Sequence, residues 1–175
     1  MSTAIPPRPR QVSKKKAHIC IVASVYNSDF TDALVENATD ELKSILPHAT
    51  ISVARVPGAF EIPVASAALL HAEEAPVVLI ALGLIIRGKT QHGDLVAESV
   101  TTSLQQLACD TKIPVIHEVL LVDDEKQAYA RCIGSQLNRG REAARSAHTM
   151  IELFSDLGLH QDNKKKSTRS YPSNA

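Results

Sequence analysis

An uninterrupted apolar stretch at residues 77–86, introduced by Pro76, constrains the fold more than any other feature of the chain. Continuous runs of this kind are typical of strands in parallel sheets, because helices cover both faces of such a sheet. At ten residues the stretch is too short to cross a lipid bilayer. The sequence therefore predicts a buried central strand and no membrane span.

Short β-rich segments and helical segments alternate around this run. Strands are expected at 18–25, 50–56, 77–86 and 115–122, and helices at 30–46, 63–71, 95–111 and from Asp123 or Asp124 to about 133. A loop containing Gly134 and Gly140 precedes a last helix that runs through Arg145 to Leu157. Alternation over about 140 residues predicts a three-layer α/β/α sandwich with a four-stranded parallel sheet.

The composition, with 44% hydrophobic and 22% charged residues, fits one globular domain, which we place at residues 17–158. The net charge of +0 is unevenly spread: nine of the nineteen Lys and Arg lie in residues 1–16 and 164–175, which contain no acid, leaving ten against nineteen acidic residues in between. The two ends of the chain, 1–16 and 159–175, are rich in Pro, Lys and Ser. We expect a disordered basic arm and tail there, and no nucleic-acid partner.

The cysteine pattern favours a cytoplasmic location. Cys20, Cys109 and Cys132 are odd in number and lack CxxC or metal-ligand spacing, as is usual for reduced thiols. No apolar segment follows the basic N-terminus, which argues against a secretory signal. We expect no metal and no membrane partner.

Ligands of parallel α/β sheets bind outside the carboxyl ends of the strands. Four segments are expected there: Tyr26 with Asn27, residues 57–61, the loop 87–94, and the surroundings of Asp123. They supply aromatic, amide, carboxylate and imidazole groups. The candidate site therefore lies at this edge of the sheet.

One motif points to a different function. Residues 83–90 match GxxxxGK[ST], the phosphate-binding P-loop, and residues 119–123 resemble the apolar strand that ends in a magnesium-binding Asp. However, the Leu, Ile and Ile at 84–86 are typical of a buried strand. Gly93 would also fall in the first turn of a helix starting at Lys89, at a cost of about 1 kcal/mol. A P-loop NTPase is the main alternative from motifs alone.

Four segments, in order, resemble the lumazine synthase family: VPGAFEIP at 56–63, GLIIRGKTQHGD at 83–94, QAYAR at 127–131 and NRGREAA at 138–144. The resemblance covers residues 17–157. It implies a flavodoxin-like fold, and it explains the P-loop string as part of a GxxIRGxTxH loop.

The resemblance implies a transferase of riboflavin biosynthesis. Such an enzyme condenses 5-amino-6-(D-ribitylamino)uracil with 3,4-dihydroxy-2-butanone 4-phosphate, giving 6,7-dimethyl-8-ribityllumazine, phosphate and water. Imine formation, phosphate elimination and ring closure need proton transfer, a phosphate pocket and an aromatic floor. No cofactor is expected.

The family pattern assigns proton transfer to His92, whose imidazole can take and give protons near neutral pH. It assigns the phosphate to Arg131, whose guanidinium can form two parallel hydrogen bonds, and to the backbone of Gly88, Lys89 and Thr90.

The same pattern gives a second set of residues for the pyrimidine and its ribityl chain. Tyr26 would stack on the ring, and Glu61 would accept hydrogen bonds from hydroxyls. The full set is Tyr26, Asn27, Ala59, Phe60, Glu61, Leu84, Ile85, Ile86 and His117.

Several positions depart from the family pattern. His117 stands where an aromatic residue, usually Phe, reaches across from a neighbouring subunit. Ser135 stands at a frequent Lys, Ile133 at a usual Gly, and Leu121-Val122 at a pair of threonines, whereas Arg139 keeps a cation at another Lys position. These changes bear on catalytic efficiency.

The resemblance also implies homo-oligomers: pentamers with active sites between subunits, in some members assembled into 60-subunit shells. The unexpanded spacing from Arg131 to Asn138 is compatible with a shell. The sequence leaves open pentamer or shell, and also a non-catalytic flavin- or lumazine-binding shell protein.

Overall fold

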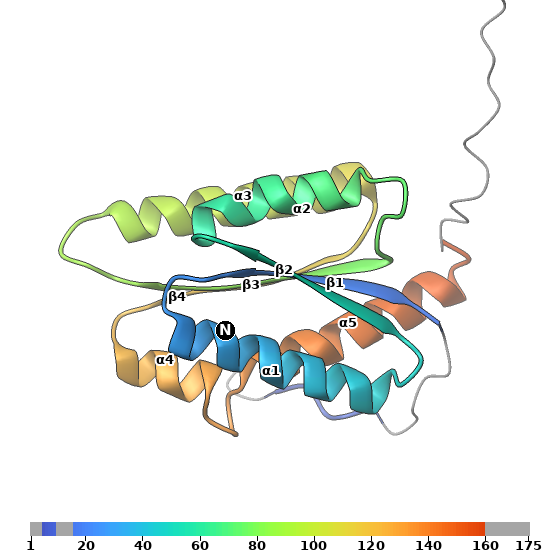
Figure 1. Ribbon diagram of the computed structural model, residues 1–175, viewed down its shortest axis with the longest axis horizontal. Coiled ribbons are helices and arrows are strands. Elements are labelled where there is room, and N and C mark those ends of the chain that lie inside the picture. The colour runs from blue at the N-terminus through green and yellow to red at the C-terminus, as the bar shows by residue number, and fades with distance from the viewer. Residues whose placement is uncertain (1–4, 10–15, 160–175) are drawn as a thin grey trace, which may run out of the picture.

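A four-stranded parallel sheet in the order β2-β1-β3-β4 forms the middle layer of the computed structural model, which describes residues 5–9 and 16–159 (Figure 1). The strands are β1 (His18–Ser24), β2 (Thr50–Val56), β3 (Val78–Ile86) and β4 (Val115–Val122). The helices are α1 (Ser28–Ile45), α2 (Ile62–Leu70), α3 (His92–Thr111), α4 (Glu125–Cys132) and α5 (Arg139–Asp156), with a 3-10 turn η1 (Ala59–Glu61). The predicted fold class is confirmed.

Helices cover both faces of the sheet, as the apolar stretch required. Figure 1 shows α2 and α3 on one face and α1, α4 and α5 on the other, and an apolar cluster lies on each side. β3 is buried from Val78 to Leu84 and contributes to both clusters. Its burial on both faces explains why its sequence does not alternate.

The two central strands end at different heights. β1 pairs with β3 only from Ile19–Val78 to Ala23–Leu82, whereas β3 and β4 remain paired as far as Ile86–Val122. The strand order reverses between β1 and β3, which is where ligand crevices form in sheets of this topology. The end of β3 therefore lies beside an open space beyond β1.

Two helices begin earlier than the sequence suggested. α3 begins at His92 rather than at 95, and Asp94 lies in its first turn, where a carboxylate interacts favourably with the helix dipole. α5 begins at Arg139, so Gly140 is helical rather than in a loop. The side chain of Asn138 caps this helix by accepting from the Arg141 N–H at 3.1 Å.

Part of the basic arm, residues 5–9, lies against the domain through contacts of Pro6 and Arg8. Arg8 Nε lies 3.2 Å from Glu41 Oε1 on α1. Arg145 on α5 donates to the same Glu41 oxygen at 2.8 Å and to the Pro6 carbonyl at 2.6 Å. A buried carboxylate shared by two arginines holds this segment. The remainder of the arm (1–4 and 10–15) and the tail from 160 lie outside the described residues.

Gly140 marks the closest approach of α1 and α5. A Cβ built there would lie 2.4 Å from the Leu34 carbonyl oxygen and 3.1 Å from the Ala38 nitrogen. We expect Gly140→Ala to lower the free energy of unfolding by about 1–3 kcal/mol, because the helices must separate. Urea unfolding measures this. Gly88→Ala is the control: its Cβ would meet nothing within 4 Å, and an equal loss there would contradict the packing explanation.

Candidate active site

A cavity of about 710 Å³ opens at the carboxyl ends of β1, β2 and β3. We call it the first cavity. Its lining consists of Tyr26, Asn27, Gly58, Ala59, Phe60, Glu61, Leu84, Ile85, Ile86, His92, Gly93, Leu95, Val96 and Ser99. It therefore gathers all the residues expected around the pyrimidine and ribityl chain except His117, and adds His92.

Asn27 joins the end of β1 to the end of β3. It adopts the left-handed conformation (φ 60°), which Asn tolerates better than most residues, and its Nδ2 donates to the Leu84 carbonyl at 3.0 Å. Backbone groups alternate in direction along a strand, so those of Leu84 and Ile86 face the cavity, whereas Arg87 N donates to Val122 on β4. The cavity thus has a polar edge in an otherwise apolar wall.

Gly58 brings an aromatic ring and a carboxylate together. Its N–H donates to Glu61 Oε2 at 2.9 Å, which fixes the carboxylate over the η1 turn. A Cβ at this position would lie 3.0 Å from Glu61 Oε2 and 3.0 Å from Tyr26 Cδ2. The absence of a side chain at Gly58 therefore allows the Tyr26 ring and the Glu61 carboxylate to line one wall.

The first turns of α3 form the opposite wall. His92, Leu95, Val96 and Ser99 share one side of this helix at helical spacing. Gly93 allows the turn to pack closely on β3, since a Cβ there would lie 3.3 Å from Ile85 Cγ2. His92 is exposed on the cavity side, and it lies in the first helical turn rather than in the preceding loop.

A second cavity of about 390 Å³ runs along the outer edge of β4. Its lining residues are Ala97, Thr101, His117, Glu118, Val119, Leu120, Leu121, Arg131, Arg139 and Glu142. Thr101 Oγ1 donates to the Ala97 carbonyl at 2.7 Å and lies 3.0 Å from His117 Nε2, so His117 donates in this pair. Burial lowers the pKa of His117.

Charged side chains gather on the inner wall of the second cavity. Arg139 forms a buried ion pair with Glu142. Glu118, on β4, is partly buried beside them, and burial followed by the charge of Glu142 raises its pKa to about 8 despite the opposing effect of Arg139. Arg131 is partly buried and donates to the Gln127 carbonyl at 3.3 Å.

An ion-pair network joins the ends of β3 and β4. Arg87 donates to Asp94 Oδ1 from Nε at 3.0 Å and from Nη2 at 2.9 Å, and it also pairs with Asp123. Gln127 Nε2 donates to Asp123 Oδ2 at 3.0 Å. These hydrogen bonds lower the pKa of Asp123, the one from Gln127 more than the one from Arg87. Of the two capping candidates, Asp124 caps α4 by accepting from Gln127 N at 2.7 Å.

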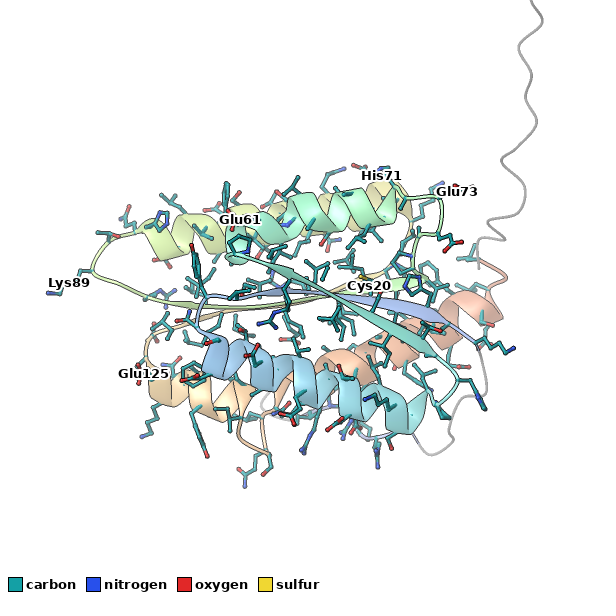
Figure 2. The ribbon with its side chains drawn as sticks, in the orientation of Figure 1. Cys20, Glu61, His71, Glu73, Lys89 and Glu125 are labelled. Atoms are coloured by element: carbon teal, nitrogen blue, oxygen red, sulfur yellow. The ribbon has the colours of Figure 1, made fainter. Side chains whose placement is uncertain are left out.

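The expected phosphate-binding backbone lies apart from both cavities. Gly88, Lys89 and Thr90 line neither of them within one copy of the chain. Figure 2 shows Lys89 at the tip of the loop between β3 and α3, pointing outward at the same end of the sheet as Glu61. Within one copy, this backbone therefore shares neither cavity with Arg131.

The pairing of β3 with β4 excludes a P-loop at residues 83–90. Gly83 to Ile86 belong to β3 and are paired with β4, so they cannot wrap around a phosphate. Gly93 by itself does not exclude a helix start in this region, because it does occupy the first turn of α3. That helix begins after Lys89 and Thr90, however, whereas a P-loop requires the helix to start at its Lys.

Within residues 5–9 and 16–159, no group of three or more His, Cys, Asp or Glu side chains is arranged to hold a metal ion. None of the helices in this part of the chain has the length and apolarity needed to cross a membrane.

Comparison with known proteins identifies the family. The family model for 6,7-dimethyl-8-ribityllumazine synthase matches residues 16–155. The protein of that name from Agrobacterium fabrum is 39% identical over 147 residues, which cover 82% of this chain and 98% of the relative. The chain belongs to the lumazine synthase family. Two further proteins named 6,7-dimethyl-8-ribityllumazine synthase support this assignment. The one from Stenotrophomonas maltophilia is 38% identical over 82% of this chain and 92% of its own length, and the one from Protochlamydia amoebophila is 36% identical over 87% of this chain and 89% of its own length.

Membership of the lumazine synthase family confirms the predicted activity, a transferase of riboflavin biosynthesis. The sequence pointed to most of the first cavity, including the segments 57–61 and 87–94 that hold Gly58 and Gly93, but it gave these two glycines no role and missed three residues on α3. Their spacing from His92 would have revealed the α3 residues had the helix start been placed correctly. Glu118 was also missed, although it follows His117 in an otherwise apolar strand and is thus a polar residue on an inward face.

We expect Gly58→Ala to raise the KM for the ribitylaminopyrimidine about five- to tenfold, because the added methyl must displace the Tyr26 ring or the Glu61 carboxylate. Steady-state kinetics with each substrate varied in turn measures this. The KM for the sugar phosphate serves as the internal control and should change less than twofold. An unchanged pyrimidine KM would show that this wall does not contact the pyrimidine.

Proposed function

We propose that the condensation takes place in the first cavity of one copy of the chain, completed by the second cavity of a neighbouring copy. The single observation that carries this proposal is the division of the expected site residues. His92 and the expected pyrimidine-binding residues other than His117 line the first cavity. His117 and Arg131 line the second, on the far side of β4. Neither cavity alone contains all the residues expected to bind the two substrates.

The exposure of apolar side chains near the first cavity supports the proposal that a second copy of the chain packs against it. The side chains of Tyr26 and Phe60 are 67% and 61% exposed, and Val64 and Leu95 are similarly open at 69% and 62%. Large apolar side chains gathered in one exposed region mark an interaction surface. A neighbouring subunit that covers them would also close the cavity to water, which strengthens the electrostatic interactions within it.

Each residue then has a defined task. Tyr26 and Phe60 form the apolar walls for the pyrimidine, with the backbone groups of Leu84 and Ile86 along its edge. The Glu61 carboxylate accepts from ribityl hydroxyls with its remaining lone pairs, since Gly58 uses only one. His117 of the neighbour closes the ring site from above.

The sugar phosphate would lie between the two copies. The guanidinium of Arg131 binds the phosphate, together with the backbone N–H groups of Gly88, Lys89 and Thr90 from the first copy. His92 transfers protons as phosphate leaves and the ring closes, because its imidazole lies in the first turn of α3 on the cavity side.

We propose a pentamer as the assembly that forms these shared sites, and light scattering decides between a pentamer and a 60-subunit shell. A cytoplasmic location is proposed on the ground that Cys20, Cys109 and Cys132 are all unpaired.

A direct assay tests the function: mixing both substrates with the protein should produce lumazine absorbance, whereas ATP should not be hydrolysed. His92→Ala should lower kcat about 10²-fold if the imidazole transfers the proton. The control is His71→Ala, at the opposite end of the sheet (Figure 2). Turnover of His92→Ala within twofold of wild type would remove its assigned role.

Arg131→Lys should raise the KM for the sugar phosphate about tenfold and leave the pyrimidine KM within twofold, because lysine loses the paired hydrogen bonds of the guanidinium. Arg55→Lys on β2 is the matched control, since Arg55 lines neither cavity. Equal increases in both KM values would contradict a phosphate-binding role.

A further inference from the structure

Glu118 is the one carboxyl that β4 contributes to the second cavity. It stands opposite Leu82 of β3 and alternates with Leu120, so its side chain lies on the sheet face that α4 and α5 cover. On that face it shares a cavity of about 390 Å³ with Arg131, Arg139 and Glu142. A phosphate bound there would therefore lie in one cavity with all four groups.

The charges around Glu118 come from two helices. From α5, Arg139 and Glu142 face it and already form an ion pair with each other. From α4 come Arg131 and Cys132, whose thiol has a pKa raised to about 12 by burial and is neutral. The α3 residues that line the cavity, Ala97 and Thr101, are uncharged.

Arg139, whose charge opposes the rise in the pKa of Glu118, is already paired with Glu142. Two carboxylates beside one arginine in a partly buried site disfavour double ionisation. Burial and Glu142 accordingly raise the pKa of Glu118 to about 8. At neutral pH the group is therefore an uncharged carboxylic acid, and it ionises just above the neutral range.

We propose that Glu118 sets the pH range in which the second cavity binds phosphate, by adding a negative charge to its wall when it ionises. This inference rests on the proposed function, because Arg131 is taken to bind the sugar phosphate there. With Glu118 neutral, the two arginines outweigh Glu142 and leave one net positive charge. With Glu118 ionised, the charges of the wall cancel.

The direction and size of the effect follow from electrostatics. At an effective dielectric constant of about 20, one unit charge within about 10 Å of a phosphate dianion weakens binding by more than about a hundredfold, so the dianion binds mainly while Glu118 is protonated. Because the pKa of Glu118 is about 8, its protonated fraction, and with it the apparent affinity for phosphate, falls about tenfold between pH 7 and pH 9. The second ionisation of a phosphate monoester, with a pKa of about 6, is complete before this range. By linkage, phosphate binding above pH 8 must draw a proton onto Glu118.

The test compares wild type with Glu118→Gln, a neutral side chain of the same shape. Between pH 7 and pH 9, the wild-type KM for the sugar phosphate should rise about tenfold, whereas the pyrimidine KM stays within twofold. Glu118→Gln should keep the pH 7 values throughout. The control Glu125→Gln removes an exposed carboxylate from the first turn of α4 and should behave as wild type.

Two further measurements isolate the titration of Glu118. Calorimetry of inorganic phosphate binding at pH 8.5, in buffers of different ionisation enthalpy, should show proton uptake by wild type and none by Glu118→Gln. Thermal melts report the pKa shift itself. The folded protein retains a proton that the unfolded chain releases near pH 4.5, so wild-type stability should fall as pH rises from about 4.5 to 8, and Glu118→Gln should abolish that fall.

The outcomes separate a failure of this inference from a failure of the proposed function on which it rests. Identical KM profiles for wild type and Glu118→Gln, or an equal rise for both substrates, would overturn the role of Glu118 while lumazine formation at pH 7 left the proposed function intact. Absence of lumazine formation by wild type at pH 7 would instead overturn the function itself.

Discussion

The unequal reach of β1 and β3 is the constraint on which the site depends. Hydrogen bonding between these strands stops at Ala23 and Leu82, but β3 continues with β4 at its other edge. The exposed edge of β3 needs polar partners, because unpaired backbone groups are costly to bury. Asn27 supplies one of them by reaching to the Leu84 carbonyl. The remaining groups stay available to a planar ligand, and the segments after β1 and β2 form the walls around it.

The two cavities differ in what they offer. The first is a mostly apolar cleft with one carboxylate and one imidazole, suited to a flat ring with a hydroxylated chain. The second is a charged slot in which cations and carboxylates are closely balanced. Arg87 links the two, since it contacts Asp94 two residues beyond His92 and Asp123 at the start of the segment that leads to Arg131. This polar network thus joins the segment that begins α3, beside the first cavity, to the segment that leads to Arg131, beside the second.

The sheet could be predicted because its signals are local. The apolar run of β3, the prolines before β3 and β4, and the glycine after β2 each act within a few residues. Helix starts were harder: His92 and Gly140 both lie in first turns that the sequence placed in loops, because tertiary contacts permit glycines there that intrinsic propensity disfavours. The raised pKa of Glu118 could not be predicted, since it depends first on burial in the folded chain and then on the charge of Glu142, from a helix more than twenty residues away.

The contacts that hold Pro6 and Arg8 against α1 and α5 also determine where a sequence fused at residue 5 would emerge. A peptide fused directly to residue 5, in place of the residues before it, would start on the sheet face that α1 and α5 cover, opposite α3, whose first turns wall the first cavity. Cargo attached there would stay clear of the pyrimidine pocket. Were identical copies to close into a hollow particle, the side on which Glu41 lies would decide whether such cargo faces the lumen or the outside.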